Sequence, residues 1–516
     1  MKFIRSGTLA VLGLCALSLS TQAASWTKLT NAAPGYTNTM LQLPDGRIMV
    51  LSDNDHQTWY FLKPDANGSY INGTWSSSAA MGTARLYFTS NVLPNGKLWV
   101  LGGEYSGTPL TQNTTNTAEI YDPAANTWTA AATFPQPNYG DVPSSMVKTP
   151  SGLRILAGYI FGPQSYLYDY VANTWAATGT KLRSDSSDEE GWVKLPDGRV
   201  LSYDIFSNIP TNGNHAQIYN PATGTWTDAS NGIIPALSSS AVGYELGPSL
   251  RLQDGRVLVI GATQHTALYT PSTNTWAAGP DILSGANSVT YTGSTTYGAD
   301  DAPGAILPNG HVLFAADQGP IKLFSGPTKL FDFNPSTSTL SDVTATFNAA
   351  VTAAGATNNL AGNPSYITRM IMLPTGQLLF SDSSSRLWVY TPDPGIVASA
   401  RPIINSVAYN GSGVFTLTGK QINGQSAGSS YGDDVQNDSN YPIIRLTNST
   451  GKVFYCKTYN WSSVDVAGGT GTVNFTLNTA VNTTLTAGNY LLTLSGAGIQ
   501  SAPLSITITS GEVSGL

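Results

Sequence analysis

Apolar runs interrupted by a glycine turn recur along the first three quarters of this chain. The turns lie in phrases such as LQLPDGRIMVL and LPNGKLWVL, and their glycines are Gly46, Gly96, Gly152, Gly198, Gly255, Gly310 and Gly376. By subtraction, successive turns lie 46 to 66 residues apart. Two short apolar segments around a tight glycine turn predict a β-hairpin.

A second recurring phrase follows four of these turns. It reads YDPAANTW, YDYVANTW, YNPATGTW and YTPSTNTW, beginning at Tyr121, Tyr168, Tyr219 and Tyr269. Each phrase predicts another tight turn that ends in a large apolar anchor. Two hairpins per repeat make a four-stranded sheet, and a radial array of such sheets is a β-propeller. The pattern therefore predicts an all-β chain with a seven-bladed β-propeller over residues 25–395.

The repeat ends at the phrase TPDPG, which spans Thr391 to Gly395. The remaining residues are rich in Ser, Thr, Gly and Val, and alternate in stretches such as VFTLTG, VNFTL and NYLLTLSG. Alternation with a period of two predicts half-buried strands. We expect residues 396–516 to form a C-terminal β-sandwich of the immunoglobulin-like type.

These phrases resemble the kelch repeat, whose blades carry a glycine-containing inner hairpin followed by a Tyr and a Trp. The Gly-Gly pair of that family stands at Gly102 and Gly103. A kelch propeller followed by a sandwich is similar to galactose oxidase and the glyoxal oxidases. The resemblance implies a copper site on the propeller axis. It implies less about function, because kelch propellers include both enzymes and binding modules.

The copper ligands that this resemblance implies are mostly missing from the sequence. The family places a Tyr-His pair before the turn of a late blade, and here Tyr366 is followed by Ile367. A second His should come from the C-terminal domain, yet His311 is the last His of the chain. The expected propeller also has no Cys for the Tyr-Cys thioether of the family. We therefore expect no copper-radical chemistry and predict no resident cofactor.

The N-terminus has the pattern of an export signal. Lys2 and Arg5 precede an apolar run, and the small residues Ala23 and Ala24 follow it. This pattern predicts a signal peptide over residues 1–24 and a secreted or periplasmic protein. Only Cys456 remains after cleavage, so no intramolecular disulfide can form, and a bacterial source is favoured.

Composition narrows the expected partners. The chain has a formal net charge of −7 and only 11% charged residues. No basic patch indicates nucleic acid or an anionic membrane, and no other apolar run is long enough to span a bilayer. A sparsely charged β-protein with many aromatic residues fits neutral glycans better than polyanions. We expect a monomer that binds an extracellular glycan or a protein surface.

The starts of the inner strands should lie on the face opposite the glycine turns, because seven residues of strand span roughly 23 Å. We count back seven residues from the Leu, or its equivalent, at each turn to find the start of each inner strand. This count places acids of blades four, five and six together at the mouth of the central channel of the propeller. Aromatic and basic residues nearby complete the expected binding face. The binding candidates are Tyr36, Arg85, Tyr87, Tyr139, Asp188, Glu189, Trp192, Glu245, Asp300, Asp301, Arg369 and Arg386.

Histidines suggest two kinds of chemistry at the same face. His215 and His265 lie in loops between second and third strands, and with Tyr366 they are the catalytic candidates. Beside the acids, they would suit a divalent metal or an acid/base pair for sugar chemistry. The alternative is that they are solvated loop residues.

A loop in the C-terminal part is a separate candidate for a cation site. It begins at Tyr431 and contains Asp433, Asp434 and Asp438. These carboxylates could bind a cation such as Ca²⁺ through oxygen ligands. They could instead cap a long hairpin through hydrogen bonds from side chain to backbone.

Two classes of function remain after these steps. In the first, the protein is a recognition module that binds a carbohydrate or another surface partner across the face of the channel mouth. In the second, it is a carbohydrate-active enzyme such as a lyase or an epimerase, with or without a metal. We prefer the binding module, because no strong catalytic motif appears in the sequence.

Overall fold

The structure is a computed structural model that describes residues 23–206, 214–232, 234–239, 245–283, 296–319, 322, 324–425, 440–477 and 485–513. The predicted signal peptide lies outside this description apart from its last two residues, and so do Asp433, Asp434 and Asp438. The regular secondary structure of the described part consists almost entirely of β-strands, which confirms the predicted all-β class. Within it, no helix is long and apolar enough to cross a membrane.

Seven four-stranded antiparallel sheets of the described chain carry the repeated glycine turns, and we name them propeller sheets 1 to 7 in turn order. Sheet 1 contains β2 (Thr37–Gln42), β3 (Ile48–Ser52), β4 (Trp59–Lys63) and β5 (Thr74–Ser77). Sheet 2 contains β7 (Thr89–Val92), β8 (Leu98–Leu101), β11 (Ala118–Asp122) and β12 (Thr127–Ala131). Sheet 3 contains β13 (Ser144–Thr149), β14 (Gly152–Ala157), β15 (Gln164–Asp169) and β16 (Thr174–Thr180).

The next three sheets repeat the same order of four strands. Sheet 4 contains β17 (Trp192–Lys194), β18 (Val200–Tyr203), β19 (Ala216–Asn220) and β20 (Thr225–Asp228). Sheet 5 contains β21 (Ser249–Arg251), β22 (Val257–Ile260), β23 (Thr266–Thr270) and β24 (Thr275–Ala278). Sheet 6 contains β25 (Gly304–Ile306), β26 (Val312–Ala316), β27 (Lys329–Asn334) and β28 (Thr339–Asp342).

Sheet 7 joins the two ends of the repeat region. It contains β29 (Arg369–Met372), β30 (Leu378–Ser381) and β31 (Leu387–Thr391), and its fourth strand is the N-terminal β1 (Ser25–Lys28). β1 pairs antiparallel with β31, with Trp26 opposite Tyr390. Helix α1 (Thr344–Ala353) packs beside β1, and the ring of Phe347 lies 5.1 Å from that of Trp26.

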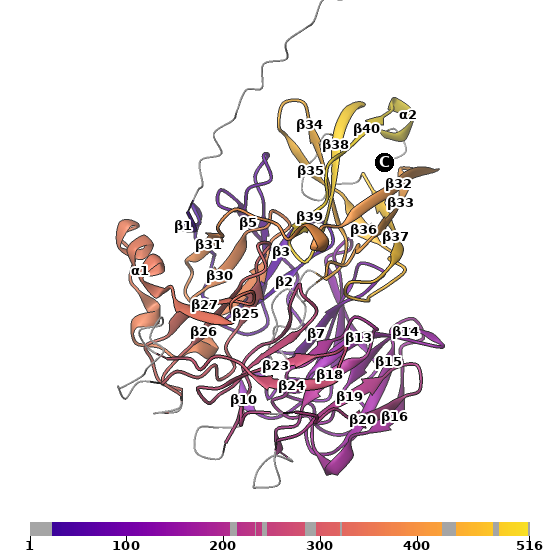
Figure 1. Cartoon of the computed structure of the whole chain (residues 1–516). Coiled ribbons are helices and arrows are strands. Elements are labelled where there is room, and N and C mark those ends of the chain that lie inside the picture. Colours follow the sequence, from indigo (N-terminus) through magenta and orange to yellow (C-terminus); the bar gives the residue numbers. More distant parts are fainter. Residues whose placement is uncertain are drawn as a thin grey trace, which may run out of the picture.

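The first strands of neighbouring sheets touch one another, which arranges the sheets around a common axis. β2 contacts β29, β25 contacts β29 and β21, and β17 contacts β21 and β13, which in turn contacts β7. These strands are buried along nearly their whole length, because sheets flank them on both sides. The fold is therefore propeller-like, as the repeat predicts (Figure 1).

The recurring tryptophans pack between sheets, as the repeat implies. The indole Nε1 of Trp128 donates to the carbonyl oxygen of Ala79 at 3.0 Å, and that of Trp175 donates to Ala132 at 3.0 Å. Trp276 makes the same bond to Ala229 at 2.8 Å. Each accepting carbonyl lies one or two residues after the outer strand of the preceding sheet, so the indole joins two sheets while its ring fills the space between them.

Two further sheets follow the repeat. One contains β32 (Ile403–Gly411), β33 (Val414–Lys420), β37 (Thr470–Thr476) and β36 (Lys457–Tyr459). The other contains β35 (Val453–Tyr455), β34 (Ile443–Asn448), β38 (Gly488–Gly496), β39 (Ile499–Gln500) and β40 (Leu504–Ile508), and the short α2 (Ser510–Val513) follows. Phe415 and Phe475 of the first sheet share a core with Leu446 and Leu492 of the second. The immunoglobulin-like type remains a prediction.

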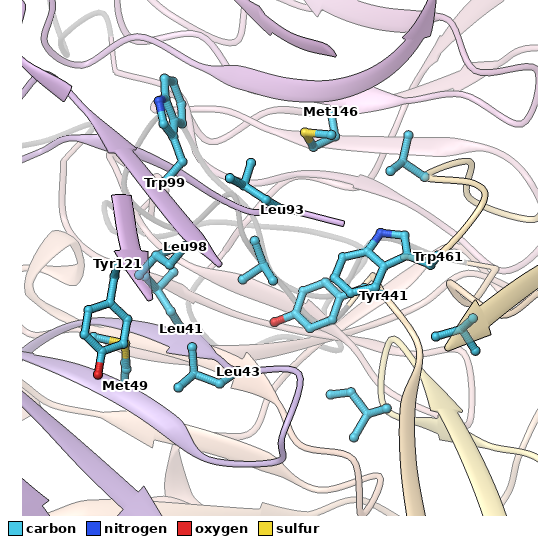
Figure 2. Packing of buried hydrophobic residues seen from close by; sticks show 14 of the residues in the cluster. Leu41, Leu43, Met49, Leu93, Leu98, Trp99, Tyr121, Met146, Tyr441 and Trp461 are labelled. Carbon is cyan, nitrogen blue, oxygen red and sulfur yellow. The ribbon is translucent and has the colours of Figure 1, made fainter. Parts of the chain in front are cut away.

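This C-terminal pair of sheets packs on the glycine-turn face of the propeller-like part. The backbone N–H of Val453 donates to Ala66 at 2.8 Å, and Lys194 Nζ donates to the carbonyl of Val464 at 2.7 Å. Tyr441 and Trp461 stack on each other and join the core that contains Leu43 and Leu93 (Figure 2). The starts of the inner strands therefore lie on the face away from these two sheets.

A small sheet inserted in sheet 2 completes the fold near that face. It contains β6 (Arg85–Leu86), β9 (Tyr105–Ser106) and β10 (Thr111–Gln112). Leu86 is paired with Tyr105 in this sheet. The pairing holds the loop after β8 close to the start of β7.

Candidate functional site

A polar cavity of about 310 Å³ lies where the inner strands begin. Six of the seven propeller sheets contribute to it. Its lining residues are Tyr87, Glu104, Tyr105, Asp141, Glu189, Glu245, Asp301, Phe324 and Tyr366. The described lining residues thus carry five carboxyl groups and four aromatic rings, and no Lys, Arg, His or Cys is among them. A volume of this size is at the lower end of the range for small-ligand pockets.

Unusual backbone conformations direct four of these side chains into the cavity. Tyr87, Asp141, Glu189 and Asp301 have φ angles between 47° and 58°. A non-glycine residue in the left-handed region is uncommon and strained by roughly 1 kcal/mol or more. Each of the four stands just before the first strand of its sheet, in sheets 2, 3, 4 and 6. The same device is therefore repeated around the axis.

Backbone hydrogen bonds link three of these turns to one another. The N–H of Glu189 donates to the carbonyl of Asp141 at 2.8 Å, and the N–H of Asp141 donates to that of Tyr87 at 3.4 Å. Glu104 N–H also donates to the Tyr87 carbonyl, at 3.3 Å. The side chains of sheets 2, 3 and 4 are thus held in a fixed relation by main chain.

A second layer of acids lies behind the lining. Burial, followed by the charges of Glu104 and Glu245, raises the pKa of Asp188 to about 7. Burial, followed by Asp317 and Glu245, raises the pKa of Asp300 to about 9. Burial also raises the pKa of Asp317. At neutral pH, Asp300 is therefore a neutral carboxylic acid next to a cavity of carboxylates.

Asp300 and Asp317 differ in their hydrogen bonding. Asp317 accepts from the backbone N–H groups of Gly319 at 2.7 Å and Ser365 at 2.6 Å, and from the Ser365 hydroxyl at 2.9 Å. Both carboxyl oxygens of Asp300 are buried without a hydrogen-bond partner among the described residues. Lack of stabilising donors agrees with its higher pKa.

The aromatic rings of the lining occur in two pairs. Tyr87 and Tyr105 have ring centroids 5.9 Å apart, and Phe324 and Tyr366 have centroids 5.4 Å apart, both edge to face. Burial, then Glu104 and Asp141, raises the pKa of Tyr105. Neutral phenols can donate hydrogen bonds, and their ring faces attract cations.

A buried ion cluster fixes the loop that carries Asp188 and Glu189. The ammonium group of Lys181 donates to Asp185 Oδ2 at 2.6 Å and to the carboxylate of Glu190, and all three side chains are fully buried. Asp204 Oδ1 lies 3.9 Å from the same ammonium. Burial would lower the pKa of Lys181, but the carboxylates, led by Glu190, raise it, so the lysine is charged.

Five of the residues expected at the channel mouth line the cavity together: Tyr87, Glu189, Glu245, Asp301 and Tyr366. Asp188 and Asp300 lie in the layer behind them. Tyr36 stands at the equivalent position of sheet 1 with 57% of its surface exposed, outside the lining. Counting back from the turns thus brings together side chains that are far apart in the sequence.

Four other binding candidates are buried in the interior, and we correct the expectation for them. Arg85 is fully buried and pairs with Glu119 at 2.7 Å, because a buried guanidinium needs a counter-charge. Arg369 is buried and donates to Asn38 Oδ1 at 3.0 Å. Trp192 donates to Glu190 at 2.9 Å, and Tyr139 packs on the ring of Phe134. These side chains support the site instead of facing a ligand.

The histidine candidates and Arg386 also lie outside the lining of the cavity. His265 Nδ1 is 2.8 Å from Asp281 Oδ1, with both side chains partly exposed. His215 is partly buried, and its carbonyl accepts from Asp204 N–H at 3.0 Å. Arg386 reaches the carbonyl of Thr357 at 3.4 Å. Tyr366 is the one residue of the catalytic set that lines the cavity.

Sequence reasoning missed Glu104, Tyr105, Asp141 and Phe324. In sheet 3 the count of seven residues back from the turn ends one residue after Asp141, which lines the cavity. Glu104 follows Gly102 and Gly103, both with positive φ, so the Gly-Gly pair was the available signal. Phe324 has a positive φ and no repeat phrase beside it.

The spacing of the carboxylates bears on whether the acids at the channel mouth could bind a metal ion. Among the described residues, acids with ligand atoms within 4.8 Å of one another occur at Asp185, Glu190 and Asp204. That position is taken by the Lys181 ammonium. No three of the described cavity carboxyl groups bring ligand atoms within 4.8 Å of one another, which does not favour a bare metal ion there. The described lining residues offer carboxyl and phenol oxygens and no imidazole.

Comparisons with known proteins find a kelch motif in one part of the chain and leave the site open. A family model described as the kelch motif matches residues 85–135, which run from β6 beyond β12 and include Gly102, Gly103 and Trp128. No curated protein matches the chain. The chain is similar to a solved structure titled "Novel fungal alcohol oxidase with catalytic diversity among the AA5 family, in complex with copper". The two share 14% identity over 95% of this chain and 100% of that one, with a TM-score of 0.48.

Proposed function

We propose that this protein is an exported carbohydrate-binding protein whose cavity takes an amine-bearing sugar unit. The observation that supports this most directly is the lining itself, in which five carboxyl groups and four aromatic rings surround one small space. Carboxylates accept hydrogen bonds from sugar hydroxyls and attract an ammonium group. Aromatic rings stack on sugar rings and add attraction for a cation.

The charge of the cavity changes the class of ligand that composition alone favoured. Composition favoured neutral glycans, but five carboxyl groups around one small cavity supply negative charge and hydrogen-bond acceptors that favour a cationic ligand. The spacing of these groups disfavours a bare metal ion. An amine-bearing sugar matches both features of the cavity, because its ammonium group is attracted by the carboxyl groups and its hydroxyl groups can donate hydrogen bonds to them. The predicted signal peptide would bring such a ligand and this protein together outside the cell.

The proposal is tested with a matched pair of oligosaccharides. We expect the purified mature protein to bind a tetramer of glucosamine in calorimetry and to show no binding of the fully N-acetylated tetramer. Added salt should weaken the binding, because the attraction is electrostatic. Glu245→Gln should weaken it about tenfold, the usual effect of removing one charged hydrogen-bond acceptor.

Asp197→Asn is the control variant for this test. Asp197 is half exposed and pairs with Arg199 at a glycine turn on the other face, so the substitution removes one negative charge away from the cavity. Equal binding of the two tetramers, or equal effects of the two substitutions, would contradict the proposal.

One observation favours an enzyme as the second candidate. Asp300 is neutral at neutral pH and lies near Glu245, and such a pair suits proton transfer at a sugar carbon or a glycosidic oxygen. A lyase or an epimerase would then act at the cavity. Mass spectrometry and NMR of the ligand recovered after incubation distinguish this candidate, because only an enzyme leaves a changed sugar.

A further inference from the structure

Exposed aromatic side chains gather on the face that contains the cavity. In the described chain, the exposed large aromatic residues are Tyr36, Phe161, Phe324 and Tyr409, with 57%, 63%, 37% and 39% of their surface accessible. Tyr409 lies in β32, in the C-terminal sheets. A single exposed ring is ordinary on a protein surface, whereas several on one face around a polar cavity indicate a binding surface.

The topology places three of these rings on the cavity face. Tyr36 directly precedes β2 of sheet 1, the position that Tyr366 occupies near β29 of sheet 7. Phe161 lies in the loop between β14 and β15 of sheet 3, which corresponds to the loop of Glu104 in sheet 2. Phe324 lies in the same kind of loop in sheet 6 and forms part of the cavity wall.

Tyr36 and Phe161 lie beyond the cavity lining, on the two sheets that flank sheet 2. Sheet 2 supplies Tyr87, Glu104 and Tyr105 to the lining. A ligand that leaves the cavity along either side of sheet 2 therefore meets an exposed ring.

Both outer rings are held on ordered loops. The backbone N–H of Tyr36 donates to Asn54 Oδ1 at 3.0 Å, and its carbonyl accepts from Asp53 N–H at 3.0 Å. The ring of Phe161 lies 6.2 Å from that of Tyr159, which in turn contacts Phe134. A ring that is already placed loses little conformational entropy when a ligand stacks on it.

We infer that the ligand is an oligosaccharide chain, with one amine-bearing unit in the cavity and units further along the chain, beyond its immediate neighbour, stacked on Tyr36 and Phe161. This inference rests on the proposed function, since the cavity provides the charged subsite. It adds that the binding surface extends over sheets 1 to 3 and recognises several units. Affinity should therefore depend on chain length through the outer rings.

The experiment is a ladder of glucosamine oligomers from dimer to hexamer, titrated against the intact mature protein by calorimetry. We expect the affinity of the wild-type protein to rise about tenfold or more from dimer to hexamer, the gain typical of stacking on an aromatic ring. Tyr36→Ala and Phe161→Ala should each reduce this rise and leave dimer binding unchanged. Tyr409→Ala is the control, since it removes an exposed ring, with 39% of its surface accessible, from the C-terminal sheets.

The outcomes separate this inference from the proposed function. If dimer and hexamer bind equally well, or if the rise with length survives in both variants, the extended surface is wrong and the charged subsite stands. If the variants weaken binding of dimer and hexamer by the same factor, the substitutions affect binding inside the cavity and not stacking of outer units, and the inference also fails. If no oligomer binds, the proposed function fails.

Discussion

At the scale of single residues, the carboxyl group of Asp300 has the most unusual environment in the site. It is fully buried, both oxygens lack a hydrogen-bond partner in the described chain, and burial, then Asp317 and Glu245, raises its pKa to about 9. An unfolded aspartate has a pKa of about 4. Between about pH 4 and pH 9, Asp300 therefore keeps its proton in the folded protein and loses it in the unfolded chain. Stability from this group is fully present below about pH 4 and is lost as the pH rises towards 9.

Asp300→Asn should remove this pH dependence, because the amide imitates the neutral acid. We expect the free energy of unfolding of the wild-type protein to fall relative to the variant by roughly 1.4 kcal/mol per pH unit within this window. From pH 5 to pH 8 the difference should change by about 4 kcal/mol in favour of the variant. Chemical denaturation at both pH values measures it. Asp197→Asn should follow the wild-type curve, and parallel curves for Asp300→Asn would show that Asp300 is ionised.

At the scale of elements, the loop between β16 and β17 shows how a buried charge can serve a surface pocket. Lys181 at its start binds Asp185 in its middle and Glu190 at its end, and Asp188 and Glu189 lie between those two acids. Glu190 also accepts from Trp192 Nε1 and the Ser202 hydroxyl, each at 2.9 Å. The ammonium group therefore closes the loop and joins it to sheet 4.

Lys181→Met should destabilise the protein by about 3 to 5 kcal/mol, because it leaves buried carboxylates without their counter-charge. The double variant Lys181→Met/Glu190→Gln should recover part of this loss, since the Gln oxygen can still accept from Trp192 and Ser202. Urea denaturation of both single variants and the double variant gives the coupling energy. Additive losses would mean that Lys181 and Glu190 do not stabilise each other.

At the scale of the whole molecule, the C-terminal sheets are joined to the propeller-like part by a shared core. Tyr441 donates through its hydroxyl to the carbonyl of Gln42, and Gln500 Nε2 donates to that of Pro374 at 3.0 Å. The ring of Tyr455 lies against Gly46, and a Cβ at Gly46 would overlap it. The turn glycine of sheet 1 thus serves both the turn, with a φ of 83°, and the contact between the two parts.

Gly46→Ala and Gly255→Ala distinguish these two roles. Both glycines have positive φ in equivalent turns, but a Cβ at Gly255 would meet nothing within 4 Å. We expect Gly255→Ala to cost about 1 to 2 kcal/mol of backbone strain. Gly46→Ala should cost roughly 2 kcal/mol more, because the added methyl group displaces Tyr455. Thermal and urea unfolding measure both, and equal losses would show that the Tyr455 contact contributes nothing.

The amount that could be predicted from the sequence differs between fold and site. The phrases around Gly46 and Gly198 predicted hairpins, and the recurring Trp128 and Trp175 predicted packing between sheets. Counting along strands reached Glu189, Glu245 and Asp301. Arg85 and Arg369, which were expected there because they lie near the counted positions, are buried, since a position along the strand does not give the direction of the side chain. The count also missed Asp141, which lies one residue before the position it gives in sheet 3.

The sequence alone determined the all-β class and the repeated hairpins, because turn residues and apolar periodicity act over a few neighbouring positions. Only the tertiary structure decided that acids from five sheets meet in one cavity beside four rings, since their distances depend on how the sheets close around the axis. It also decided which charges are paired. Lys181 and Arg85 find their carboxylates inside the fold, the cavity acids come from five sheets to one space, and such burial and charge cannot be seen in the order of residues.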